Sequence, residues 1–245
     1  RAGDLLGNLR RVNEFEFARQ ISRLDSSVDR NEWFMTPQTV NAYANPLMNE
    51  IVFPAAILQP PFFDPLADDA VNYGGIGGVI GHEFSHGFDD SGRRYDGEGN
   101  LRDWWTFDDN VRFRERAGRL VAQYSQYKPI ADRSINGDLT LGENIGDLSG
   151  LAVAYRAYLI SLNGKEAPVI DGFTGPQRFF LGWAQVWRRK YRDDELRTRL
   201  ITDSHSPSEY RCNGVVTNMA EFYDAFGVKP GDRLYREPTE RVKIW

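Results

Sequence analysis

Cysteine is almost absent from this sequence, in which Cys212 is the only one among 245 residues. A single cysteine excludes an internal disulfide. The sequence also has no Asn-x-Ser/Thr acceptor for N-linked glycans. Both absences fit a bacterial protein better than a glycosylated animal ectodomain, although neither decides between the cytoplasm and an exported location.

Long apolar runs and a strong excess of one charge are also missing. No run approaches the roughly 18 residues of a membrane span. Charges of both signs are mixed along the chain, and the net charge of −5 argues against a nucleic-acid surface. The chain begins at Arg1 rather than methionine, so the lack of a targeting segment carries no conclusion. The hydrophobic fraction of 41% is enough for a sizeable core.

Histidine is scarce, and two of the three histidines stand in the segment His82-Glu-Phe-Ser-His86. Residues four apart share one face of a helix, so two imidazoles at this spacing can hold one zinc ion. Glu83, beside the first histidine, can reach a water molecule at such an ion. With histidine this rare, chance would give the pattern on the order of once in several hundred such chains. The segment therefore predicts a zinc site that still needs a third ligand.

Apolar residues surround this motif, namely Ile76, Val79, Ile80, Phe84 and Phe88, and they predict that its helix is buried. The glycines that precede it, within 74–81, do not match the spacing Gly-x-Gly-x-x-Gly, which disfavours a nucleotide enzyme. We expect these glycines to let another helix or strand approach closely.

A second informative segment runs from Asn136 into an apolar stretch. Glu143 and Asp147 are four residues apart and therefore share a helical face, and the residues that follow predict that this helix is buried. Buried carboxylates need cations or hydrogen-bond donors. Glu143 is a candidate third ligand, and Asp147 a candidate acceptor from the outer nitrogen of a zinc-bound histidine. The alternative is that both merely complement the helix dipole.

The third histidine, His205, lies in a polar segment near a proline, which predicts a loop that also carries Arg211. The two side chains can donate to a developing oxyanion and to a peptide carbonyl. Alternatively, they are exposed loop residues without a role. Earlier in the chain, β-prone runs flank Asn45-Pro46 and predict a hairpin, whose edge can pair with an extended peptide or be purely structural.

The apolar spacing predicts a mainly α-helical fold with this small β element, an α+β arrangement. Helices are expected over 10–27, 107–126, 176–190 and 217–226. The first is expected to be a packing helix. Loops are expected over 59–69, 89–103 and 163–176, which are rich in proline, glycine or polar residues.

Taken together, five blocks resemble the catalytic C-terminal part of the neprilysin and endothelin-converting-enzyme family of zinc metallopeptidases, in a bacterial version. They occur in the family's order and span nearly the whole chain: Asn41-Ala-Tyr with Phe53-Pro54, His82 to Asp89, Gly142 to Asp147, His205 to Arg211, and Trp245. Many metallopeptidases share the His-Glu-x-x-His block. The glutamate block and the His-Ser-Pro-x-x-x-Arg block are much more specific.

The resemblance implies a thermolysin-like gluzincin site in one catalytic domain over residues 1–245, with one zinc ion per chain. It implies roles for ten residues of these blocks: zinc ligands His82, His86 and Glu143; general base Glu83; Asp147 and Asp89 as partners that orient the histidines; His205 as stabiliser of the tetrahedral intermediate; Arg211 as a clamp on a substrate carbonyl; and Asn41 and Ala42 as binders of the peptide backbone.

The implied activity is hydrolysis of internal bonds in oligopeptides, on the amino side of hydrophobic residues. A secreted or periplasmic location is favoured over the cytoplasm. The sequence departs from the family because it does not contain the large helical N-terminal lobe. One alternative is a peptide-binding half-enzyme, inactive without that lobe, and its expected partner is the lobe as a separate fragment. Another is an inactive metal-binding domain that captures peptides, which the presence of Glu83 disfavours.

Overall fold

The computed structural model describes residues 1–245 and consists of two compact units, Arg1–Met35 and Thr36–Trp245. The first unit contains helix α1 (Leu5–Ile21), whose N-terminus is capped by Asp4 through a 3.0 Å bond from the Gly7 amide. Within this unit none of the residues of α1 is buried. The predicted helix is therefore present but shorter at its C-terminal end, and its packing role stays a prediction.

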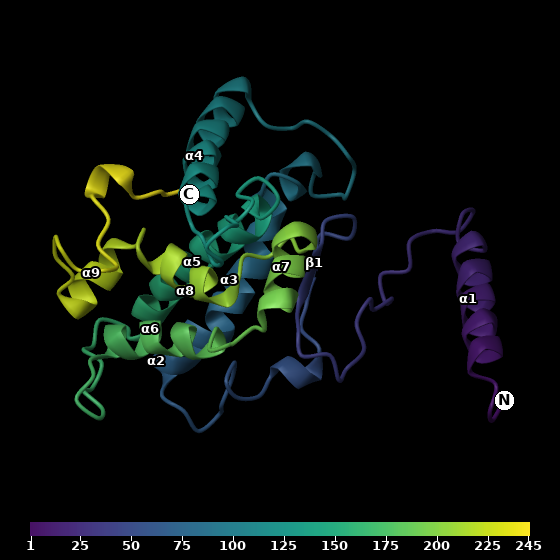
Figure 1. The fold of residues 1–245 in the computed structure, drawn as a ribbon, viewed down its shortest axis with the longest axis horizontal. Helices are drawn as coiled ribbons and strands as arrows, with labels where there is room; N and C mark the ends of the chain where they lie inside the picture. Colours follow the sequence, from purple (N-terminus) through teal and green to yellow (C-terminus); the bar gives the residue numbers. More distant parts are fainter. The chain divides into compact units, whose positions relative to one another are not determined.

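The second unit is mainly helical, which confirms the predicted fold class. No helix of the structure is both long and apolar enough to cross a membrane. The strands and helices of the second unit, in chain order, are β1 (Tyr43–Asn45), β2 (Glu50–Val52), α2 (Asp69–Asn72), α3 (Gly78–Ser85), α4 (Phe107–Ser125), α5 (Leu141–Ser161), α6 (Gly175–Val186), α7 (Asp193–Thr202), α8 (Ser208–Val216) and α9 (Ala220–Phe226) (Figure 1).

The predicted hairpin is confirmed. β1 and β2 pair antiparallel, with Tyr43 opposite Val52, and together they form a two-stranded sheet. Ala42, immediately before β1, is buried in a small cluster with Ile57 and Ile76. Because Val79 of α3 packs against this cluster, the hairpin is held beside the helix that carries the His-Glu-x-x-His motif.

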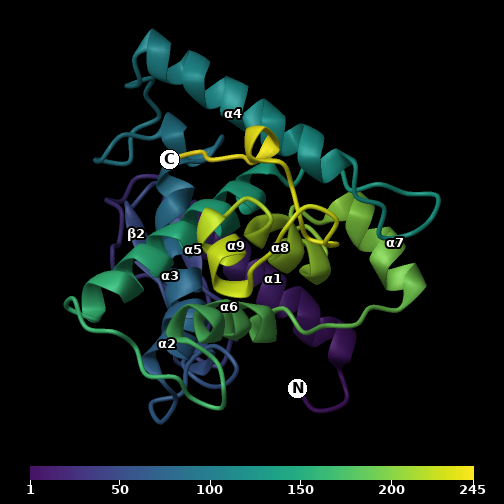
Figure 2. The same ribbon diagram turned by 90° about the vertical axis from the view of Figure 1, so that its left-hand side faces the viewer.

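Helices α3 and α5 lie side by side at the centre of the unit (Figures 1 and 2). Their backbones touch: a Cβ atom on Gly81 would lie 2.3 Å from the carbonyl oxygen of Gly150, and one on Gly150 would lie 2.3 Å from the amide nitrogen of His82. A third glycine, Gly74, lies equally close to the backbone of α6. The expected close approach at the glycine-rich segment is therefore confirmed, and it brings the two motif-bearing helices together.

The predicted burial of the apolar residues around the motif is wrong for three of them. Ile80, Phe84 and Phe88 are all exposed, whereas His82 and Glu83 are buried. The reason is that backbone contact with α5 leaves no room for large side chains on that face of α3. Small and polar residues therefore face α5, and the large apolar ones project away from it.

A core of aromatic and aliphatic side chains supports the pair of helices from the far end of α5. Tyr158 of α5 packs against Phe179 of α6, and Trp183 is fully buried, as expected for its spacing. The helix expected over 107–126 coincides with α4, and that over 217–226 contains α9. Helices α7 and α8 were not expected from the sequence.

Candidate metal centre and active site

The two histidines of the motif face each other on α3 and at its C-terminal cap. Their Nε2 atoms are 3.0 Å apart. On the outer side, His86 Nδ1 bonds to Asp89 Oδ2 at 2.7 Å, and His82 Nδ1 lies 2.9 Å from Asp147 Oδ1. The structure thus places both predicted aspartate partners against the ring nitrogens that point away from the paired Nε2 atoms.

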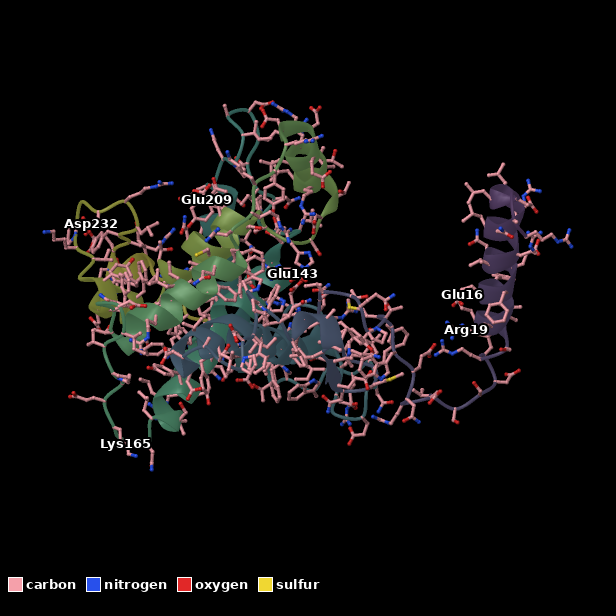
Figure 3. All side chains as sticks on the ribbon, turned by 90° about the horizontal axis from the view of Figure 1, so that it is seen from below. Glu16, Arg19, Glu143, Lys165, Glu209 and Asp232 are labelled. Atoms are coloured by element: carbon pink, nitrogen blue, oxygen red, sulfur yellow. The ribbon has the colours of Figure 1, made fainter.

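Glu143, the predicted third ligand, lies in the first turn of α5 and reaches the same point. Its Oε2 is 3.1 Å from His82 Nε2 and 3.1 Å from the Nε2 of His205, and its Oε1 is 3.9 Å from His86 Nε2. Figure 3 shows Glu143 among crowded side chains, whereas Glu209 lies at the periphery. Oε2 is buried and has no hydrogen-bond partner of acceptable geometry.

These residues fit a divalent metal ion. With a carboxylate against each Nδ1, neutral imidazoles keep their protons on the outer nitrogens, and both Nε2 lone pairs, whose atoms are 3.0 Å apart, are then available to one metal ion. A cation between them also satisfies the buried Oε2 of Glu143. Two imidazole nitrogens and one carboxylate oxygen form a donor set that zinc prefers.

Two glutamates lie near this point, and their environments differ. The ligating atoms of His82, Glu83 and His86 all lie within 4.8 Å of one another, so distance alone would also admit Glu83 as a ligand. Burial raises the pKa of Glu83 above its usual value. Burial acts on Glu143 as well, but His205 and His82 outweigh it and hold the pKa of Glu143 well below its usual range. This contrast favours the predicted roles, with Glu143 as ligand and Glu83 as the group that exchanges a proton, and both roles stay predictions.

His82 is the most strongly perturbed histidine. Burial alone would lower its pKa, but the carboxylates of Asp147 and Glu143 outweigh burial and raise the pKa to about 9. Without a metal ion this imidazole therefore carries a proton at neutral pH. A metal ion must displace that proton in order to bind.

The sequence context predicted a loop at Arg211, and this prediction is wrong. Arg211 is buried in α8, which begins at Ser208 immediately after Pro207, and the carbonyl of Pro207 accepts the amide of Tyr210 at 2.8 Å. Its guanidinium makes a two-pronged ion pair with Asp147, at 2.6 and 2.7 Å, and stacks on the Trp187 ring at 4.1 Å. It therefore links the aspartate that faces His82 to the aromatic ring of Trp187.

His205 lies in the linker between α7 and α8, and its side chain is 39% exposed. Asp203, which the sequence analysis missed, holds it: Asp203 Oδ1 accepts both the ring Nδ1–H and the backbone N–H of His205, each at 2.8 Å. Burial opposes protonation of the ring, but Glu143 and Asp203 outweigh it and raise the pKa of His205. An aspartate two residues before a loop histidine was the available signal, because Asp side chains commonly bond to backbone two residues on.

A glycine of α5 also contributes to the site without having been singled out. A Cβ atom on Gly146 would lie 2.7 Å from Nδ1 of His82. The absent side chain leaves room for the imidazole between the two helices. The spacing of Gly142 and Gly146, one turn apart beside Glu143, was the signal for such a contact.

Asn41 and Ala42 precede the β1 ladder, which begins at Tyr43. Ala42 is buried beside α3 and Asn41 is exposed. The expected peptide-binding segment is thus the stretch that leads into the strand, next to the helix with the paired histidines. Its binding role stays a prediction.

Comparison with known proteins places this geometry in a family. Residues 41–242 match the sequence profile of Peptidase family M13. Neprilysin-3 of Drosophila melanogaster is 43% identical over 235 residues, which is 94% of this chain and 30% of that protein. Endothelin-converting enzyme 1 of Homo sapiens is 43% identical over 242 residues, 97% of this chain and 31% of that protein.

Solved structures agree with the sequence matches. The zinc metalloprotease Zmp1 of Mycobacterium tuberculosis, in complex with an inhibitor, has a TM-score of 0.96 at 59% identity, over 99% of this chain and 38% of that one. PepO from Lactobacillus rhamnosis has a TM-score of 0.89 at 38% identity, over 100% of this chain and 37% of that one. The chain belongs to Peptidase family M13 and has its thermolysin-like gluzincin fold, and it spans about a third of the length of these relatives.

Proposed function

We propose that this chain carries the catalytic centre of a zinc-dependent endopeptidase, which hydrolyses internal peptide bonds of oligopeptides. The observation that carries the proposal is the contrast between two glutamates beside one pair of facing imidazoles, with Glu143 held charged and Glu83 biased toward accepting a proton. One zinc ion per chain would be held by His82, His86 and Glu143. The likeness to Zmp1, a zinc metalloprotease, over 99% of this chain supports this choice of metal and reaction.

Bound zinc supplies a Lewis acid that polarises the peptide carbonyl and acidifies water at neutral pH. Glu83 takes the proton of the attacking water and gives it to the leaving amine, which suits a carboxylate whose pKa is raised. His205, held by Asp203, donates to the oxyanion of the tetrahedral intermediate. Asp147 and Asp89 keep the two histidine rings in orientation.

Substrate binding is assigned to both sides of this centre. Asn41 and Ala42 hold the peptide backbone in an extended form. Arg211 holds a substrate carbonyl with the guanidinium edge that Asp147 does not occupy. We carry over the family preference for cleavage on the amino side of hydrophobic residues, and Trp187, whose ring stacks under Arg211, supplies an apolar wall for such a side chain.

A second candidate is a half-enzyme that binds peptides but needs a further lobe in order to cleave them. It is favoured by one observation: the chain covers only 30% to 38% of the length of its relatives. In this case zinc would still bind, because every candidate ligand belongs to this chain.

The test compares the chain with Glu83→Gln and with the control Glu115→Gln, which changes an exposed glutamate of α4. We expect one zinc per chain in all three. Cleavage of a quenched fluorescent heptapeptide should be chelator-sensitive and should fall by about 100- to 10,000-fold only in Glu83→Gln. Zinc without cleavage by the unchanged chain would favour the half-enzyme, and adding the N-terminal lobe should then restore cleavage. No zinc at all would contradict the assignment of His82, His86 and Glu143.

A further inference from the structure

We propose that Arg199 is a positioning residue for His205, which it orients through the carboxylate of Asp203. The inference rests on the proposed function, because it concerns the group assigned to the oxyanion. Arg199 lies in the last turn of α7, four residues before Asp203, and the two side chains form an ion pair through Asp203 Oδ2. None of the five sequence blocks contains it.

The two oxygens of Asp203 have separate tasks. Oδ1 accepts both bonds from His205, one from the ring and one from the backbone, and Oδ2 faces the guanidinium of Arg199. The amide of Asp203 also donates to the carbonyl of Arg199 at 2.9 Å. A carboxylate held at both oxygens cannot rotate, so the direction in which it fixes the imidazole is set by Arg199.

Arg199 is itself fixed by Tyr191. Its guanidinium lies 5.5 Å from the centre of the Tyr191 ring, an attractive cation–π arrangement. The Tyr191 hydroxyl lies 2.7 Å from Ser208 Oγ and accepts the Ser208 amide at 3.2 Å. Ser208 is the first residue of α8. The contacts therefore run from the start of α8 through Tyr191, Arg199 and Asp203 to His205, and they close a ring around the linker that carries this histidine.

The linker itself is anchored at Ser206, which is buried and donates to Asn144 Oδ1 at 2.7 Å, but this contact does not orient the imidazole of His205. The His205 side chain is 39% exposed, and its other nitrogen lies 3.1 Å from the carboxylate of Glu143. A donor stabilises an oxyanion only from about 2.7–3.1 Å, and a misplacement of about 1 Å can cost 100-fold in rate. Arg199 therefore supports the transition state and contributes little to the binding of the uncleaved peptide.

The experiment uses the full chain and compares Arg199→Gln with Arg197→Gln. Arg197 is a matched control, because it lies on the same helix and forms an ion pair with Asp132, at 2.9 Å, instead of Asp203. We expect Arg199→Gln to lower kcat by roughly 10- to 100-fold with KM nearly unchanged. It should weaken binding of a phosphonate peptide, a stable analogue of the tetrahedral intermediate, by a similar factor. Arg197→Gln should change neither.

A double-mutant cycle tests the route of the effect. If Arg199 acts through Asp203, the loss caused by Arg199→Gln should largely disappear in an Asp203→Asn background. Equal additional losses in both backgrounds would overturn the inference, as would a raised KM with unchanged kcat. If Arg199→Gln does not fold, Arg199→Lys and Arg197→Lys repeat the comparison with the charge retained. We expect about threefold weaker phosphonate binding for Arg199→Lys alone, since an ammonium lacks the planar fork.

The controls separate this inference from the proposed function. An unchanged chain that neither cleaves peptides nor binds the phosphonate in the presence of zinc would overturn both. An active unchanged chain in which the Arg199 and Arg197 variants behave alike would overturn the role of Arg199 and leave the proposed function in place.

Discussion

Arg211 joins two parts of the site through one side chain. Its guanidinium is paired with Asp147, whose carboxylate faces His82, and its flat side rests on Trp187. Burial alone would raise the pKa of Asp147. Arg211 and His82 outweigh burial, and the pKa of this fully buried carboxyl is lowered. The proposed contact of Arg211 with substrate would therefore be coupled to the orientation of His82 through a single residue.

This coupling predicts a large stability cost for Arg211→Met, which keeps the packing of the side chain but removes its charge. Asp147 would be left buried with no guanidinium, and the free energy of unfolding should fall by about 3–5 kcal/mol in urea titrations of the metal-free protein. Arg233→Met is the control, because Arg233 forms an exposed ion pair with Glu209, which lies on the same helix as Arg211, and its loss should matter by less than about 1 kcal/mol. Similar losses in both variants would contradict the assignment of a buried pair.

Helices α3 and α5, together with the α3 C-cap residue His86, carry the whole candidate ligand set, and the spacing of the two helices depends on glycine. We predict that Gly150→Ala destabilises the protein by about 3 kcal/mol or more, because its Cβ would lie 2.3 Å from the His82 amide nitrogen and the helices would have to separate. Zinc affinity, measured by competition with a chromophoric chelator, should fall as well.

Gly118→Ala provides the matched control within another helix. Gly118 lies in α4, and a Cβ atom there would meet nothing within 4 Å. This change should raise the free energy of unfolding by up to about 1 kcal/mol without an effect on zinc. A Gly150→Ala variant that keeps both its stability and its zinc affinity would show that the backbone contact does not set the ligand geometry.

Sequence spacing predicted those elements whose signal is local. The four-residue intervals His82–His86 and Glu143–Asp147 fix which side chains share a helical face, whatever the rest of the fold. Helix α4 was predicted because one face is apolar and the other charged. The glycines before the motif predicted a close backbone contact but could not identify α5 as the partner helix.

The remaining features depend on tertiary contacts. The exposure of Ile80 and Phe84 follows from the face at which α5 approaches, which helical periodicity cannot specify. The sequence predicts a loop where helix α8 lies, because a Ser-Pro pair is compatible with a turn or with a helix start. The importance of Asp203 appears only when Arg199, from the unpredicted α7, lies on its other side.

The protein as a whole should respond to pH in opposite ways with and without metal. The folded metal-free protein holds a proton on His82 with a pKa of about 9, against about 6.5 when unfolded. This stabilisation, on the order of 3 kcal/mol, is complete below pH 6.5 and is lost as the pH rises toward 9. The lowered pKa of Glu143 contributes stability above about pH 4.5, which is lost on acidification.

We therefore expect the thermal midpoint of chelator-treated protein to fall between pH 6.5 and pH 9.5. With excess zinc the midpoint should instead rise from pH 6 to pH 8, because protons compete less with the metal for His82. Scanning calorimetry of both forms in the same buffers checks this. A metal-free midpoint that rises with pH would contradict the carboxylate environment assigned to His82.

The contact between Gly81 and Gly150 has a consequence for genetics. No layer of side chains separates the helices there. Because no side chains can repack to absorb a small shift of α5, such a shift moves Glu143 relative to both histidines. The far end of α5 is anchored by Tyr158 against Phe179, remote in sequence from every ligand. Mutations at that anchor should therefore weaken zinc binding, and extra zinc supplied to cells should restore the activity of such variants. Mutations at Glu83 should not be rescued by zinc.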